Sequence, residues 1–214
     1  MARIVLLRHA HSVANEKNLL AGRTAGISLS KTGKEQAKDL IVRLGAIEFD
    51  EVAISPLQRC RETIDPWLTS TRAKSRIVVD DSISEVDYGS WSGKTLSSLR
   101  RKAQWKVVQD FPSQMIFPGG ESLLEMQGRA LSGFYRLNAV KGKGPRLIVS
   151  HGDVIKSIVA HCLGMHLDQF QRLVIEPASL TIIDTDSGTS RLVRFNDAKG
   201  FLTSEESKNQ SAIG

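Results

Sequence analysis

Short apolar runs alternate with stretches of helical periodicity along most of the chain. Runs typical of buried strands lie at residues 3–7, 51–55, 76–79 and 146–150. Between them, apolar positions recur every three or four residues, as they do on one face of a helix. This alternation predicts an α/β protein: a three-layer sandwich in which a mostly parallel central sheet carries helices on both faces.

Capping and breaking residues predict where the helices of the first half begin and end. Thr32 and Glu35 form a capping-box pattern, and the helix that follows is expected to end at Gly45. Another helix is expected from Leu57, and Pro66 should end or kink it because proline lacks the amide hydrogen that an interior helical residue donates.

The second half of the chain continues the same pattern. A capping box at Ser122 predicts a helix to about residue 138, and a further helix is expected at about 154–162. Late strands are expected near 180–184 and 191–195, joined by a hairpin turn at 186–188.

The segment at about 92–118 interrupts this order and is interpreted as an insertion that forms a small helical lid. It contains one helical stretch at about 96–108, and Pro112 and Pro118 act as breakers. We therefore expect a single domain over residues 1–198 that includes this insertion, followed by a polar, flexible tail at 199–214.

Composition narrows the class of protein. The chain has 214 residues, of which 41% are hydrophobic and 24% charged, which is typical of an ordinary soluble globular protein. Two cysteines are too few for a disulfide framework and favour a reducing, cytoplasmic compartment. No apolar run near the start is long enough for a signal sequence or a membrane span, so we expect no membrane partner.

The net charge of +6 is compatible with nucleic acid, an acidic surface or a small anion as partner. Lysines and arginines are scattered among acidic residues, and only 6% of residues are aromatic. A nucleic-acid binder would instead show a contiguous basic face or an aromatic stacking ladder. The sequence therefore predicts no nucleic-acid partner.

Cationic side chains follow the apolar strands at the point where each strand ends. Arg8 and His9 follow the first strand, Arg59 lies shortly after the second, and His151 and Gly152 follow the strand at 146–150. Parallel strands bring such ends to one crevice. Cations that gather without carboxylates repel one another unless an anion joins them, and phosphate matches the guanidinium group best.

Together these segments resemble the histidine phosphatase superfamily, the phosphoglycerate mutase-like enzymes, over roughly residues 3–195. The resemblance depends on the order and spacing of four motifs, at residues 8–10, 55–63, 84–93 and 150–152. The segments AGRTAG, EVDYG and FPGGES are similar to those of an actinobacterial phosphatase or phosphomutase branch. The resemblance implies phosphoryl transfer through a phosphohistidine, without metal or cofactor.

The resemblance also implies roles for single residues. His9 would be the nucleophile, Glu85 the acid and base, and Arg8, Arg59 and His151 would hold the phosphate oxygens. Like-charge repulsion from the neighbouring cations would favour a neutral His9. Asn15 and Gly152 would also bind phosphate.

Several residues keep two interpretations. Asn15 fits a phosphate donor and a helix-cap residue equally well, and Arg23 fits either a contact to a second anionic group of the substrate or an exposed loop. Glu121 is a rival acid to Glu85. His11 fits a pocket residue or, better, a solvated loop histidine.

Two residues depart from the family pattern. Ala10 stands where the family commonly has glycine, which would matter if the backbone there needed a positive φ. Ser92 replaces a common glutamate and is expected to alter loop packing rather than catalysis.

Three functions remain open at this point. Hydrolysis of a small phosphorylated metabolite is favoured, because the insertion at about 92–118 lacks the basic, proline-rich segment of glycolytic mutases. A cofactor-dependent phosphomutase with the same intermediate is the alternative, and a non-catalytic anion binder is the third. The expected partner is a small phosphorylated substrate, with a homodimer as a further possibility.

Overall fold

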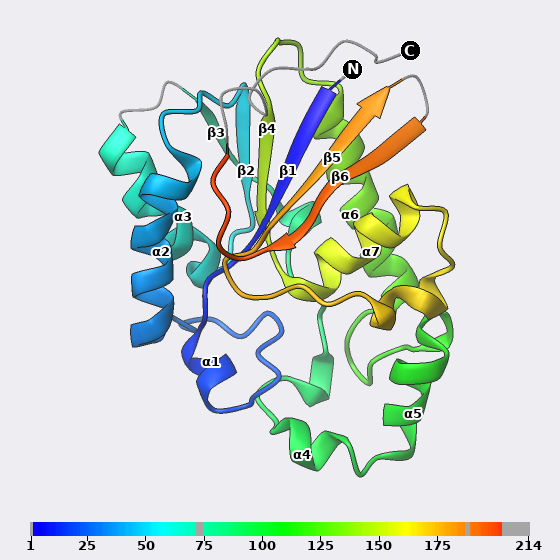
Figure 1. Ribbon diagram of the computed structural model, residues 1–214. Helices are drawn as coiled ribbons and strands as arrows, with labels where there is room; N and C mark the ends of the chain where they lie inside the picture. Colours follow the sequence, from blue (N-terminus) through cyan, green and yellow to red (C-terminus); the bar gives the residue numbers. More distant parts are fainter. Residues whose placement is uncertain (1, 72–74, 187–188, 203–214) are drawn as a thin grey trace.

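The computed structural model describes residues 2–71, 75–186 and 189–202, and a six-stranded sheet runs through its middle (Figure 1). The strands lie in the spatial order β3-β2-β4-β1-β5-β6. Their bounds are Ala2–Arg8 (β1), Glu51–Ile54 (β2), Arg76–Val79 (β3), Arg146–Ser150 (β4), Leu180–Asp186 (β5) and Thr189–Asp197 (β6). The first four strands run parallel, whereas β5 is antiparallel to β1 and to β6. The predicted mostly parallel sheet is confirmed.

Helices cover both faces of the sheet (Figure 1). On one face α2 (Lys31–Leu44) and α3 (Gln58–Thr71) pack over Val5 and Leu7 of β1, and on the other α6 (Leu123–Asn138) and α7 (Gly152–Cys162) pack over Ile4 and Leu6. Successive strand residues point to opposite faces, so one apolar strand supplies both cores. The three-layer sandwich is therefore confirmed.

The predicted beginning of α2 at Thr32 is wrong by two residues. Ser30 is the N-cap, and its hydroxyl accepts a hydrogen bond from the Gly33 amide at 3.2 Å. Gly33 packs directly against the backbone of His11, where a Cβ would come within 1.9 Å of the carbonyl oxygen. This close contact fixes the position of the first helical turn, in which Ser30 and not Thr32 is the N-cap residue.

Pro66 does not end α3, which continues to Thr71. Ile64 and Trp67 lie on either side of the proline and are both completely buried under the sheet. Apolar burial of these two side chains offsets the hydrogen bond that a proline removes from the helix interior.

The insertion contains two short helices rather than one helical stretch. They are α4 (Leu96–Leu99) and α5 (Ala103–Asp110), separated by exposed basic residues. Trp91, just before α4, is buried and stacks against Trp105 of α5, with ring centroids 6.4 Å apart. The aromatic side chains therefore attach the insertion to the core on the α6 and α7 face.

The remaining helices are short, and the last described residues pack onto the body of the protein. These helices are α1 (Val13–Glu16) and the 3₁₀ turns Asp81–Ile83, Gly89–Trp91, Pro112–Gln114 and Leu167–Arg172. The Arg43 guanidinium donates to the Gly200 carbonyl at 3.1 Å, and the Leu202 amide donates to the Arg43 carbonyl at 2.8 Å. The rest of the expected tail and most of the expected hairpin turn lie outside the described residues.

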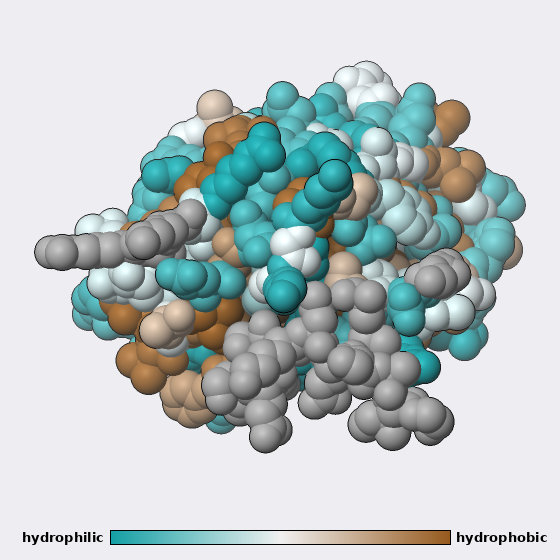
Figure 2. Space-filling view, turned by 90° about the horizontal axis from the view of Figure 1, so that it is seen from above, coloured by the Kyte–Doolittle hydropathy of each residue, from teal (hydrophilic) through white to brown (hydrophobic). Residues whose placement is uncertain are grey.

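The face seen in Figure 2 lies opposite the carboxyl ends of the parallel strands. Hydrophilic and hydrophobic residues are interspersed on it. In the described part of the chain, no helix combines the length and the apolar character needed to cross a membrane.

Candidate active site

Three strand ends meet at one edge of the sheet and bring the cationic residues together. The His9 amide donates to the Ser150 carbonyl at 2.8 Å, and the Ser55 amide donates to the Val149 carbonyl at 3.0 Å. His151 is the N-cap residue of α7. The loops after β1, β2 and β4 therefore lie side by side, as expected for an open α/β sheet.

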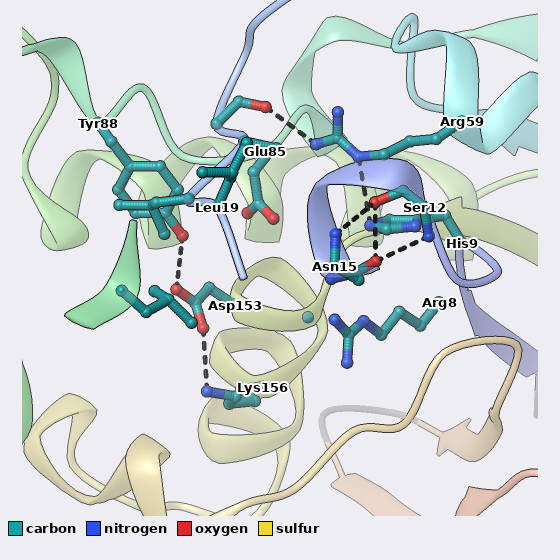
Figure 3. A pocket seen from close by; sticks show the side chains of 15 residues that line it. Arg8, His9, Ser12, Asn15, Leu19, Arg59, Glu85, Tyr88, Asp153 and Lys156 are labelled. Atoms are coloured by element: carbon teal, nitrogen blue, oxygen red, sulfur yellow. Dashed lines mark hydrogen bonds and ion pairs between the residues drawn. The ribbon is translucent and has the colours of Figure 1, made fainter. Parts of the chain in front are cut away.

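The pocket at this edge has a volume of about 220 Å³ (Figure 3). Its wall includes six of the residues predicted from the sequence: Arg8, His9, Asn15, Arg59, Glu85 and Gly152. His151 lies beneath the wall, with its ring centroid 5.2 Å from that of His9.

The hydrogen bonds of His9 assign its tautomer. Nδ1 lies 2.8 Å from the Ala10 carbonyl oxygen, which can only accept, so Nδ1 carries the proton. The Arg59 Nε–H points at the opposite nitrogen, Nε2, from 3.2 Å. Burial and the charges of Arg59 and Arg8 lower the pKa of His9 well below its ordinary value. His9 is therefore a neutral imidazole in the pocket wall, and its unprotonated Nε2 accepts a hydrogen bond from Arg59.

Arg59 joins three loops at the floor of the pocket. Its Nη2 donates to the Gly22 carbonyl at 2.9 Å and to His151 Nδ1 at 3.1 Å, in addition to the bond from Nε to His9. The side chain is buried, and no carboxylate of the described residues is hydrogen-bonded to it. A buried guanidinium held by neutral partners remains available to an anion.

His151 is a second neutral imidazole. Burial and the charge of Arg59 lower its pKa well below the ordinary value. Because Nδ1 accepts from Arg59, Nε2 carries the proton, and it lies 2.7 Å from the Ser55 hydroxyl. The Cys60 thiol is 3.5 Å from the same nitrogen, and burial raises the pKa of that thiol to about 12, so it stays protonated.

Arg8 has an unused donor. Its Nη1 donates to the Ile175 carbonyl, but its buried Nε has no hydrogen-bond partner among the described residues. Gly152 lies beside this guanidinium, where a Cβ would stand 3.5 Å from Arg8 Nε. A buried donor without a partner is costly, which is consistent with a site that receives an anion.

Asn15 has the helix-capping role that one of its two interpretations predicts, and phosphate binding stays a prediction. Its Oδ1 accepts from the Ser12 amide at 2.9 Å and from the Ser12 hydroxyl at 2.8 Å, which makes Asn15 part of the capping box of α1. Because the oxygen is occupied in this way, the amide NH₂ group is the part of the side chain left for the pocket (Figure 3).

Glu85 is one of the two carboxyl groups in the pocket wall, and Asp153 is the other. Burial and the negative charge of Asp153 raise its pKa from 4.5 to about 7. Its Oε1 accepts from the Val86 amide at 3.0 Å, and its Oε2 lies 3.9 Å from His151 Nδ1. A carboxyl with this pKa can donate and accept protons at neutral pH.

Glu121 and Arg23 meet each other outside this pocket. Glu121 accepts from Arg23 at 3.0 Å and from Arg129 at 2.6 Å. Burial alone would raise the pKa of Glu121, but the hydrogen bonds from Arg129 and the Asp87 amide hold it below its ordinary value. The geometry therefore favours Glu85 over Glu121 as the acid. Arg23 also donates to the Glu85 carbonyl at 2.9 Å, which places it behind the loop of Glu85.

Ala10 and His11 take no direct part in the pocket wall. Ala10 lacks a positive φ and packs in a small apolar cluster with Leu29, Ala37 and Ala178, so its methyl group replaces the common glycine without strain. His11 Nδ1 lies 2.8 Å from the Ser30 hydroxyl.

Nine residues of the pocket wall had no role assigned from the sequence, and Tyr88, Asp153 and Lys156 are among them. Tyr88 donates to Asp153 Oδ2 at 2.8 Å, and Lys156 lies 2.9 Å from Asp153 Oδ1 (Figure 3). The spacing of Asp153 and Lys156, three residues apart just after His151, was the available signal. In the described part of the chain, no three His, Cys, Asp or Glu side chains form a group suited to a metal ion.

The sequence model of the histidine phosphatase superfamily (branch 1) matches residues 4–198. The chain belongs to this superfamily. It is 28% identical to phosphoserine phosphatase 1 of Hydrogenobacter thermophilus over 92% of each chain. It is also 28% identical to a 2,3-bisphosphoglycerate-dependent phosphoglycerate mutase of Cytophaga hutchinsonii, over 92% of this chain and 89% of that one.

A solved structure gives the same fold. The α-ribazole phosphatase of Shigella flexneri superposes with a TM-score of 0.82 at 24% identity, covering 94% of this chain and 99% of that one. The protein is thus a histidine-phosphatase-family enzyme, in a family that includes phosphatases and mutases.

Proposed function

We propose that this enzyme hydrolyses phosphomonoesters of small metabolites through a phosphohistidine on His9. The observation that carries the proposal is the neutral His9 in the pocket wall, whose unprotonated Nε2 accepts a hydrogen bond from Arg59 in a pocket that Arg8 also lines. A neutral imidazole nitrogen is a nucleophile, and fixed cations stabilise the charge that develops on a transferring phosphoryl group.

In the first step, His9 Nε2 attacks phosphorus as the bond from phosphorus to the ester oxygen breaks. The phosphate oxygens accept hydrogen bonds from the N–H groups of Arg59 and from the Nε–H of Arg8, which has no partner among the described residues. The phosphate dianion also favours a protonated His151, whose Nδ1–H then donates to an oxygen. Glu85 gives its proton to the departing ester oxygen, so the organic part of the substrate leaves as an alcohol.

In the second step, the Glu85 carboxylate removes a proton from water, and the resulting hydroxide attacks the phosphohistidine. The bond between Nε2 and phosphorus breaks, inorganic phosphate leaves, and His9 and protonated Glu85 are restored. The pKa of Glu85 near 7 suits both directions of proton transfer.

A small substrate is supported by the size of the pocket. Its volume of about 220 Å³ lies below the roughly 300–1,000 Å³ of pockets for drug-sized ligands. The named relatives support the same class, since phosphoserine is a small phosphomonoester.

Hydrolysis of p-nitrophenyl phosphate by the wild type and by His9→Ala tests the proposal. We expect the substitution to abolish turnover, and a phosphoryl label that is labile in acid and stable in base should be trapped only on the wild type. Equal hydrolysis rates for the two proteins would overturn it.

The mutase relative keeps phosphoryl transfer to a second hydroxyl as the alternative function. Product analysis decides between the two, because a mutase returns the phosphoryl group to an organic acceptor, whereas a phosphatase releases inorganic phosphate. The actinobacterial branch, the homodimer, the cytoplasmic location and independence from metal and cofactor stay predictions.

A further inference from the structure

In the reaction proposed above, Asp153 acts only through the effect of its charge on the pKa of Glu85, and Lys156 has no task. Asp153 and Lys156 stand on the first turns of α7, and both line the pocket. Asp153 Oδ1 is 2.9 Å from Lys156 Nζ, and its Oδ2 accepts from the Tyr88 hydroxyl at 2.8 Å. Lys156 Nζ also donates to Gln171 Oε1 at 3.0 Å. Both charges are held by the protein, and Lys156 retains one N–H for a ligand.

The charges of the wall separate into two groups. Among the described residues that line the pocket, the cations are Arg8, Arg59 and Lys156. The two arginines together balance a phosphate dianion. Burial alone would raise the pKa of Asp153, but Lys156 and Tyr88 lower it, so Asp153 is ionised and neutralises Lys156. The pair of Asp153 and Lys156, which is left after the arginines have balanced the phosphate, therefore carries no net charge.

The rest of the wall, as far as the described residues line it, adds no further cation. The protein supplies Leu19, Leu20 and Leu96 on that wall, together with the Glu85 carboxyl. A second anionic group on the substrate could use the remaining N–H of Lys156 only beside the Asp153 carboxylate, and to take Lys156 as its own counter-charge it would have to displace Asp153. The Asp153 carboxylate would then lie in a largely buried site without its cation, next to another anion.

Resting on the proposed function, we infer that Asp153 determines substrate class: the organic part of the substrate is polar but carries no net charge. A polyol or a zwitterionic amino acid meets this condition, because it hydrogen-bonds to Lys156 and Asp153 without separating them. A carboxylate or a second phosphate is selected against by the charge of Asp153.

Three phosphomonoesters of similar size test the inference: glycerol 1-phosphate, phosphoserine and 3-phosphoglycerate. Wild-type kcat/KM should be at least about tenfold lower for 3-phosphoglycerate than for the other two, since like charges at close range oppose binding strongly. Asp153→Asn keeps the side-chain shape and removes the charge, and it should reduce this difference by about tenfold.

Two further variants make the result specific to charge in the pocket. Lys156→Gln leaves Asp153 unpaired and should increase the discrimination against 3-phosphoglycerate, opposite to Asp153→Asn. Glu35→Gln makes the same charge change as Asp153→Asn on the exposed side of α2, where Glu35 pairs with Lys38, and should leave the substrate ratios unchanged. A purely structural role for Asp153 would not move the two pocket variants in opposite directions.

The inference would be overturned if the wild-type kcat/KM for 3-phosphoglycerate equalled or exceeded the values for the other two esters. It would also be overturned if Lys156→Gln and Asp153→Asn left the ratios of kcat/KM among the three esters unchanged. In that case the proposed function would still hold if His9→Ala loses the p-nitrophenyl phosphate hydrolysis that the wild type shows. If the wild type hydrolyses none of these esters, the proposed function fails, and calorimetric binding of the three compounds then decides the inference by the same order of affinities.

Discussion

Replacing Glu85 by glutamine should weaken catalysis and stabilise the fold at the same time. Burial and Asp153 raise the pKa of this carboxyl from 4.5 to about 7. About half of Glu85 is then protonated at pH 7, compared with about 0.3% of a carboxyl with the ordinary pKa. Without that proton, poor leaving groups depart as alkoxides. We expect Glu85→Gln to lower kcat for glycerol 1-phosphate by about 10²–10⁴-fold and kcat for p-nitrophenyl phosphate much less.

The stability effect has the opposite sign and depends on pH. Below pH 4.5 the carboxyl is protonated in both folded and unfolded states, so its ionisation has no effect. As pH rises from 4.5 to about 7 the unfolded state loses this proton more readily, and the ionised carboxylate costs about 3 kcal/mol of folding stability above pH 7. Glu85→Gln removes that cost.

Urea unfolding of both proteins at pH 4.5 and pH 8 measures the effect. The stability of Glu85→Gln relative to the wild type should rise by up to about 3 kcal/mol between these pH values. Glu35→Gln, at an exposed site, is the control and should show no such rise. A relative stability of Glu85→Gln that is equal at both pH values, or an equal loss of kcat for both substrates, would refute the reasoning.

Three other substitutions test neighbouring parts of the site. Ser55→Ala removes the hydroxyl 2.7 Å from buried His151 Nε2, which should cost about 1–3 kcal/mol in urea unfolding and lower kcat for p-nitrophenyl phosphate. Ala10→Gly should destabilise by about 0.5–1 kcal/mol in the same assay without raising activity, since the backbone there needs no positive φ. Arg129→Met removes donors to the Ser84 and Glu85 carbonyls and leaves Glu121 with Arg23 as its remaining arginine partner in the described part of the chain, so thermal unfolding should report a loss of about 1–3 kcal/mol.

The floor of the site could be predicted from the sequence because it depends on strand ends. Arg8, His9 and His151 follow directly from strands whose apolar pattern is clear, and parallel pairing brings such ends together. The roles of these residues remain a proposal, but their proximity is a property of the fold. The sheet and its two helical layers could be predicted for the same reason, because the apolar runs and the helical periodicity alternate along the chain.

The outer parts of the site depend on tertiary packing that no local pattern contains. Arg23 and Glu121 are 98 residues apart and meet only because the loop of Glu85 lies between them. Tyr88 reaches Asp153 across 65 residues in the same way. Nor could the sequence decide between Ser30 and Thr32 as the cap of α2, because the choice depends on the distant contact between Gly33 and His11.

The position of β1 has a consequence for the dynamics of the enzyme. It lies between β4 and β5, and its ladder continues past the strand end, where the His9 amide donates to Ser150. Exchange of that amide with deuterated solvent should therefore require opening close to global unfolding. Leu96, which also lines the pocket, belongs to a four-residue helix whose amides should exchange through local openings of low free energy. The pocket can thus adapt around Leu96 while His9 keeps its position.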